Sequence, residues 1–220
     1  QITQDSQILF HRSLADRLPR IAPFLQYDKD PHLAVGPDGG LYYIQDAYTT
    51  SDLFPDAQSF DPSTLPATGL DGQPINYIRN SVKIVENAYT GDMKFYIADP
   101  SDPIIRTYQN IFPGLFIPLD QMPAELVAHL RVPEDMFNVQ NQTFARYHVT
   151  DPSSFYNNED RWTVPENPSG SQALANEAYY RRAPRSRQGE LQTIGAFFHP
   201  LDAIRNWNRV YGPGGFRQYQ

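Results

Sequence analysis

The chain has 220 residues, of which 40% are hydrophobic and 13% aromatic, which is enough to bury a core and argues against disorder. It contains 20 prolines and no cysteine, so the sequence excludes disulfides, thiolate metal sites and a cysteine nucleophile. The net charge of −7 combines −11 over residues 1–170 with +4 over residues 171–220, and the acidic body argues against a nucleic-acid partner. The longest stretch without a charged residue, 107–119, is too short to span a bilayer.

Two β-hairpins are predicted in the first hundred residues. Residues 33–48 contain two apolar runs around Gly-Pro-Asp-Gly-Gly at 36–40, and residues 75–98 contain two more around Thr-Gly-Asp at 90–92. Between the hairpins, residues 53–74 hold four prolines and two glycines. This composition predicts a loop, because proline cannot donate to a β-ladder and glycine is costly to order.

Short helices are predicted after residue 100, each begun by a proline at the first helical position. The prolines that begin these helices are Pro103, Pro123, Pro133 and Pro152, and two of them follow an aspartate that can cap free N–H groups. After the first of them, Ile105, Tyr108 and Ile111 fall on one helix face. A further helix is predicted at residues 202–210. The order predicts an α+β fold, with antiparallel hairpins followed by short proline-started helices and a separate C-terminal fragment.

Acidic pairs are the first candidates for chemistry in the body of the chain. Glu134 and Asp135 could form a general acid–base pair, but they stand at a predicted helix start, where the helix dipole favours acids, so the structural interpretation is preferred. Glu159 and Asp160 form a similar pair, and adjacency in sequence does not show that two carboxylates converge on a substrate. The Asn141-Gln142-Thr143 glycosylation pattern lies on a predicted helix, and chance is the preferred explanation.

Metal ligands are the second kind of candidate. Asp28 and Asp30, with Tyr27 and Asp38 nearby, could offer calcium the oxygen ligands that it prefers. The glycine and terminal glutamate of an EF-hand loop are missing, so a calcium- or carbohydrate-binding surface here is the weaker interpretation. The five histidines lack zinc-type spacing, and the sequence contains no nucleophile elbow, P-loop or dinucleotide fingerprint. The sequence therefore predicts no catalytic residue and no metal site.

A series of longer motifs runs in order through the acidic body. They include Arg17-Leu18-Pro19-Arg20-Ile21-Ala22-Pro23-Phe24-Leu25, Asp46-Ala47-Tyr48-Thr49-Thr50, Asn76-Tyr77-Ile78-Arg79-Asn80-Ser81-Val82-Lys83, Phe112-Pro113-Gly114-Leu115-Phe116, Pro133-Glu134-Asp135 and Arg146-Tyr147-His148. With these motifs the chain resembles uncharacterised protein family 0182 over about residues 6–168. The resemblance implies a bacterial polytopic membrane protein with N-terminal spans and a large domain outside the membrane, of which this chain would be the front. It implies no particular reaction.

The basic tail carries a different set of motifs. They include Tyr179-Tyr180-Arg181-Arg182, Phe197-Phe198-His199-Pro200-Leu201-Asp202 and Trp207-Asn208-Arg209. Residues 175–220 thereby resemble the substrate domain of FAD-linked oxidases of the decaprenylphosphoryl-ribose oxidase type. The resemblance implies that a sugar pocket is lined by Leu201, Ile204, Trp207, Arg209, Gln218 and Gln220. The flavin-binding domain of that family has no counterpart in this sequence, so no cofactor is expected in this chain, and FAD only if the oxidase interpretation holds.

The two resemblances divide the chain. Residues 1–168 are predicted to be a partial extracytoplasmic domain, 169–174 a linker, and 175–220 a partial oxidase substrate domain, so that the chain joins two unrelated fragments. The predicted function is a non-catalytic, structural or binding role on the extracytoplasmic side of a bacterial cell membrane, with the membrane-embedded remainder of the parent protein as partner. The alternative is an FAD-dependent oxidoreductase that acts on a sugar or polyprenyl-phosphoryl sugar and is represented only by part of its substrate domain.

Overall fold

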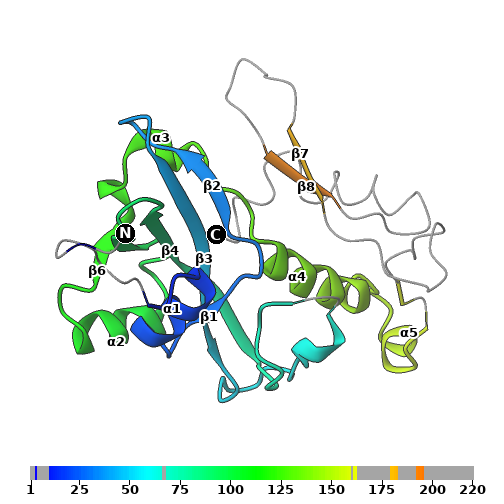
Figure 1. The fold of residues 1–220 in the computed structure, drawn as a ribbon. Helices are drawn as coiled ribbons and strands as arrows, with labels where there is room; N and C mark the ends of the chain where they lie inside the picture. Colours follow the sequence, from blue (N-terminus) through cyan, green and yellow to red (C-terminus); the bar gives the residue numbers. More distant parts are fainter. Residues whose placement is uncertain are drawn as a thin grey trace.

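A six-stranded sheet organises the chain. The computed structural model describes residue 3 and residues 10–65, 68–159, 161–162, 179–182 and 192–195. The strand order is β1-β3-β4-β5-β6, and β2 also pairs with β3 (Figure 1). The strands of this sheet are β1 (Gln26–Tyr27), β2 (His32–Val35), β3 (Leu41–Ser51), β4 (Tyr77–Asn87), β5 (Met93–Ile97) and β6 (Phe116–Pro118).

The long strands β3 and β4 form the middle of the sheet and pair antiparallel. Their register shifts between Ala47 and Thr49, because β3 advances two residues there while β4 advances three, from Val82 to Arg79. A β-bulge of this kind re-aims the side chains next to it. Here it accompanies the approach of the Thr49 and Ser81 hydroxyl oxygens to 3.1 Å.

Helices and short 3-10 turns follow or separate the strands. They are α1 (Leu14–Ile21), η1 (Pro62–Thr64), α2 (Pro103–Ile111), η2 (Leu119–Gln121), α3 (Ala124–Val127), α4 (Glu134–Tyr147) and α5 (Pro152–Tyr156). Asp102 caps α2 by accepting from the Ile104 N–H at 2.9 Å, and Asp151 caps α5 by accepting from the Ser154 N–H at 2.8 Å. Further along, β7 (Tyr179–Arg182) and β8 (Gln192–Gly195) pair antiparallel with each other.

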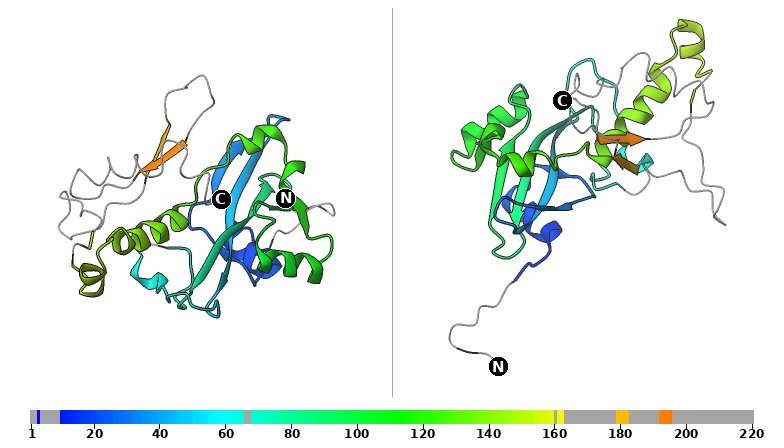
Figure 2. Two further views of the ribbon diagram at one scale, coloured as in Figure 1. Left: turned by 180° about the vertical axis from the view of Figure 1, so that it is seen from behind. Right: turned by 90° about the horizontal axis from the view of Figure 1, so that it is seen from above.

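Helices pack on both faces of the sheet. One face packs against α1 and α2, and its buried residues include Leu18, Ala47, Val82, Ile84, Phe95 and Ile105. The opposite face packs against α3 and the residues before it, and its buried residues are Ala34, Ile44, Val85, Tyr96, Met122 and Leu126. A third cluster joins the loop before β4 to α4 and consists of Tyr48, Leu65, Leu70, Ile75 and Val139. The views in Figure 2 show α4 extending beyond the sheet.

The α+β prediction is confirmed, as are both hairpins and the four helices led by prolines. Pro123 and Pro133 differ from the prediction, because they are the N-cap residues of α3 and α4 and not their first helical residues. Ile111 was predicted on the buried face of α2 but is 57% exposed. The sequence did not predict α1, which contains Pro19, or the short parallel strand β6.

Two predicted elements concern residues that the structure does not describe. The predicted linker at 169–174 and the predicted helix at 202–210 lie outside the described residues. In the ranges that the structure describes, no helix is both long and apolar enough to cross a membrane.

Candidate functional site

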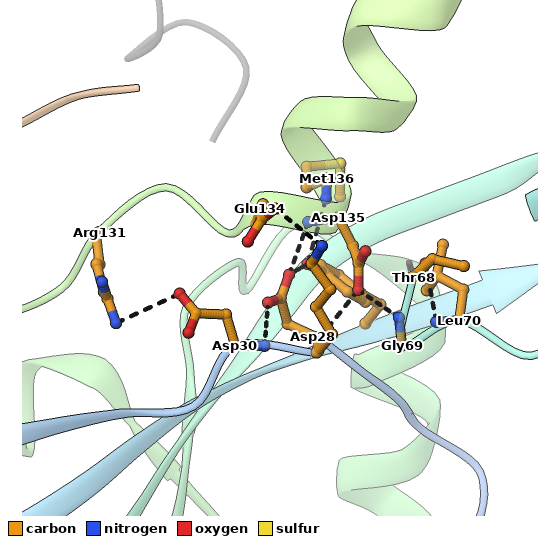
Figure 3. Close-up of polar contacts among 11 residues, drawn as sticks. Asp28, Asp30, Thr68, Gly69, Leu70, Arg131, Glu134, Asp135 and Met136 are labelled. Carbon is orange, nitrogen blue, oxygen red and sulfur yellow. Dashed lines mark hydrogen bonds and ion pairs between the residues drawn. The ribbon is translucent and has the colours of Figure 1, made fainter. Parts of the chain in front are cut away.

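Asp28 lies directly after β1 and is 5% exposed. Its Oδ2 accepts a hydrogen bond from the Tyr48 hydroxyl and another from the Asp135 N–H at 2.9 Å. Its Oδ1 accepts from the Asp30 N–H, also at 2.9 Å (Figure 3). One buried carboxylate therefore connects β3, the start of α4 and its own turn.

Asp135 is the second carboxylate of the site and has no solvent exposure. Its Oδ2 accepts from the Lys29 N–H at 3.1 Å and from the Gly69 N–H at 2.9 Å, whereas its buried Oδ1 has no hydrogen-bond partner. Asp28, Tyr48, Asp135 and the N–H groups of Lys29 and Gly69 form the Asp28–Asp135 cluster. The cluster holds together four segments that lie apart in the sequence.

Ion pairs flank this cluster on its more open side. Lys29 Nζ lies 2.9 Å from Glu134 Oε1, and Arg131 Nη2 lies 3.5 Å from Asp30 Oδ2. Both pairs join the turn between β1 and β2 to the residues at the start of α4 (Figure 3). They therefore reinforce the same junction as the buried carboxylates.

The electrostatics of the cluster favour a bound proton. Burial raises the pKa of Asp28 to about 6; hydrogen bonds from the Tyr48 hydroxyl and the Asp135 N–H oppose the rise, and the Asp135 carboxylate adds to it. Burial also raises the pKa of Tyr48 well above its ordinary value, so its hydroxyl stays protonated and donates to Asp28. The cluster can thus gain or lose one proton in mildly acidic solution.

Gly69 shows how closely the backbone segments approach each other here. A Cβ atom at this position would lie 2.5 Å from the Tyr27 carbonyl oxygen and 2.7 Å from the Lys29 nitrogen. Both neighbours are backbone atoms, which cannot move aside as a flexible side chain can. Residue 69 must therefore be glycine for its N–H to reach Asp135.

A second buried carboxylate network lies on the other face of the sheet. Asp102 has no solvent exposure, and its Oδ2 accepts from the hydroxyls of Thr49 and Ser81. Its Oδ1 accepts from the Tyr77 hydroxyl at 2.8 Å and from the Ile104 N–H at 2.9 Å. The same side chain therefore caps α2 and fastens it to β3 and β4.

One buried and one partly buried ion pair tie strands and helices together. Lys83 on β4 pairs with Asp46, its cross-strand neighbour on β3. Arg17 on α1 pairs with Glu86 on β4 and also donates to the Gly91 carbonyl oxygen at 2.5 Å. Because buried charges are costly when they are unpaired, these contacts fix the positions of the elements that carry them.

The described residues do not support the weaker interpretation of a calcium-binding surface. Asp38 lies in the turn of the first hairpin, where it accepts from the Gly40 N–H and the Tyr42 hydroxyl, each at 3.0 Å. Asp28 instead faces Asp135, 107 positions away. Within the described ranges, no group of three or more His, Asp or Glu side chains is placed to hold a metal ion. The position of Asp38 therefore separates it from the oxygen ligands that it was expected to join.

The structure also shows where the acidic pairs and the glycosylation pattern lie. Glu134 and Asp135 occupy the first turn of α4, as predicted. The prediction missed the partners of Asp135, because no local pattern points to contacts with Lys29 and Gly69. Asn141 is 2% exposed, so the glycosylation pattern is not accessible. Glu159 is exposed, and Asp160 lies outside the described residues.

The six residues predicted to line a sugar pocket cannot be placed in this way. All of them lie outside the described residues: Leu201, Ile204, Trp207, Arg209, Gln218 and Gln220. The expected sugar and FAD interactions of the tail stay predictions.

Comparison with known proteins adds one decisive observation. The model of the uncharacterised protein family UPF0182 matches residues 1–200. This chain belongs to that family. UPF0182 proteins of Desulforamulus reducens and Salinibacter ruber are 48% and 49% identical to it over 179 and 180 residues, in each case 81% of this chain. A UPF0182 protein of Pelotomaculum thermopropionicum is 44% identical over 82% of the chain.

The chain spans 18% of the length of each of these three relatives. No solved structure matches it. The family match continues to residue 200 and so crosses the predicted junction at 169–174. The division of the chain into two unrelated fragments stays a prediction.

Proposed function

We propose that this chain is a non-catalytic, structural or binding module in the extracytoplasmic domain of a bacterial integral membrane protein. The supporting observation is the use of its buried charges. In the described part of the chain, every buried charged side chain contacts another segment of the fold: Asp28, Asp46, Lys83, Glu86, Asp99, Asp102, Glu134 and Asp135.

Catalytic acids and bases must reach a substrate, directly or through one water molecule. The carboxylates of Asp28, Asp102 and Asp135 are instead buried and accept hydrogen bonds from donors of the protein itself. Their positions join loops and helix starts to the sheet. This arrangement supports a module in which the buried charges hold the elements of the fold in position and do not act on a substrate.

The location outside the membrane is supported by the family resemblance, and the length of the relatives supports a larger remainder beside the module. Since the chain spans 18% of those proteins, a module of this size would work beside a much larger remainder. That remainder, including its membrane-embedded part, is the proposed partner.

Cysteine labelling tests the location, because the chain has no cysteine of its own. Leu53 is 84% exposed, so Leu53→Cys in the full-length protein, with any other cysteines removed, provides a single accessible thiol. We expect a membrane-impermeant maleimide to label it on intact cells. Ile105→Cys is the matched control, because Ile105 is fully buried and its thiol should react only after denaturation. Labelling of Leu53→Cys only after permeabilisation would place the module in the cytoplasm and overturn the proposal.

An absorbance scan of the purified protein tests the non-catalytic role. The oxidase alternative requires a bound flavin, whose chemistry the protein would orient and tune. We expect no flavin absorbance and no oxidation of sugar substrates. Stoichiometric flavin together with turnover would replace the proposed role with the enzymatic one.

A further inference from the structure

The strand β2 leaves one edge of the sheet open. It pairs with β3 along one side, and none of the other described strands pairs with its second side (Figure 1). Its sequence, His32-Leu33-Ala34-Val35, has no lysine or proline, which are the residues that commonly protect edge strands from pairing. The edge is therefore open to a further strand.

The backbone hydrogen bonds show which groups face outward. Gly36 donates to the Gly40 carbonyl oxygen at 2.8 Å at the turn of the hairpin. Because bonded and non-bonded pairs alternate in an antiparallel ladder, Ala34 bonds to β3 and the N–H and C=O groups of Leu33 and Val35 point away from it. Among the described residues, the outward donors and acceptors of Leu33 and Val35 have no backbone partner at this edge.

The side chains of the same residues form an exposed apolar patch. Leu33 and Val35 are each 52% exposed, and Leu41, the cross-strand neighbour of Val35, is 37% exposed. Ala34, on the other face of the strand, packs into the core under α3. The patch of Leu33, Val35 and Leu41 therefore lies on the uncovered face of the hairpin, beside the unpaired backbone.

The small area of this edge favours a strand of the same polypeptide over a separate partner protein. A stable complex with a free partner buries about 1,200 Å² or more in total, which a four-residue edge with three partly exposed side chains cannot supply. A strand within the same polypeptide needs far less area, because its effective concentration is on the order of millimolar or higher. The relatives have ample chain for this, since the 179 matched residues cover only 18% of the length of the Desulforamulus reducens protein.

We propose that the edge of β2 receives an extended strand from the full-length polypeptide beyond these 220 residues, with apolar side chains that cover Leu33, Val35 and Leu41. This strand addition would continue the sheet past β2 and join the module to the rest of the protein. It does not depend on the side of the membrane on which the module lies, so its failure is distinguishable from failure of the proposed function.

Amide hydrogen exchange resolved to single residues tests the strand addition. In the isolated 220-residue chain we expect the amides of Leu33 and Val35 to exchange rapidly, while that of Ala34 is protected by its bond to β3. In the full-length protein we expect the Leu33 and Val35 amides to become at least tenfold slower, with little change at Ala34. Val35→Lys in the full-length protein should return the Leu33 amide to rapid exchange, whereas Leu53→Lys, at another exposed leucine, should not.

Three results would overturn the proposal. Equally rapid exchange of the Leu33 amide in both proteins would show that no strand adds to the edge. Protection in the isolated chain that grows with protein concentration would identify a second copy as the occupant. Protection in the isolated chain at every concentration would show that the strand lies within these 220 residues.

Discussion

Asp28 is a carboxyl group placed where burial favours its protonated form. Its pKa rises from 3.8 to about 6, so between these pH values the folded protein holds a proton that the unfolded chain has released. The free energy of unfolding should therefore fall as pH rises through this window, by at most about 3 kcal/mol from this group. We expect Asp28→Asn to remove this slope, which urea unfolding at a series of pH values would measure.

The wild type must be compared with Asp28→Asn because His32 changes the free energy of unfolding with pH in the opposite direction. Burial lowers the pKa of His32, so its contribution to stability is lost as pH falls below its ordinary pKa. Asp151→Asn is the control. Asp151 is an exposed cap whose pKa is lowered by the Ser154 N–H, so this substitution should leave the slope of the unfolding free energy between pH 4 and 6 unchanged. Parallel curves for the wild type and Asp28→Asn would contradict the role of Asp28.

Gly69 offers a second test at the scale of a single residue. Gly69→Ala places a Cβ against two backbone atoms and displaces the N–H that Asp135 accepts. We expect a loss of about 2–4 kcal/mol in the free energy of unfolding. Gly72→Ala, in the same loop, has no atom within 4 Å of the added carbon and should change stability little. Equal denaturant midpoints for the two variants would show that the loop moves aside.

Among the elements, α2 depends most clearly on one side chain. Asp102→Ala removes the N-cap of α2 and leaves the buried hydroxyls of Thr49 and Ser81 without their acceptor. The expected loss is about 3 kcal/mol, from the cap and the unsatisfied groups together. Asp151→Ala removes a similar cap from α5 in an exposed position and should have a much smaller effect on thermal unfolding. Similar losses in both variants would mean that the buried network adds nothing to capping.

The same two caps show what the sequence could predict. Asp-Pro at both helix starts is a local signal, as is the Gly-Pro-Asp-Gly-Gly turn, and the elements that these signals predict are present. The contact between Asp28 and Asp135 has no local signal, because it depends on how the chain returns to the sheet after 107 positions. The helix α1 was missed for a different reason. Pro19 has a low helix propensity, but α1 forms because the packing of Leu18 in the core outweighs it.

At the scale of the whole molecule, β3 connects the two buried networks. Tyr48 donates to Asp28 and so holds the start of α4, while the next residue, Thr49, donates to Asp102 and holds α2. The two carboxylates lie on opposite faces of the sheet, but their donors share a peptide bond at the β-bulge. A shift of the backbone at this point would alter both networks together.

A double-mutant cycle with Tyr48→Phe and Thr49→Val measures this connection. Each substitution removes one hydroxyl donor and keeps the shape of the side chain, and we expect a coupling energy of about 0.5–1.5 kcal/mol in denaturant unfolding because neighbouring residues share one backbone segment. Tyr48→Phe combined with Thr90→Val, in the exposed loop between β4 and β5, should be additive within about 0.5 kcal/mol. Additivity in both cycles would mean that the two buried networks do not influence each other, and that α2 and α4 are held independently.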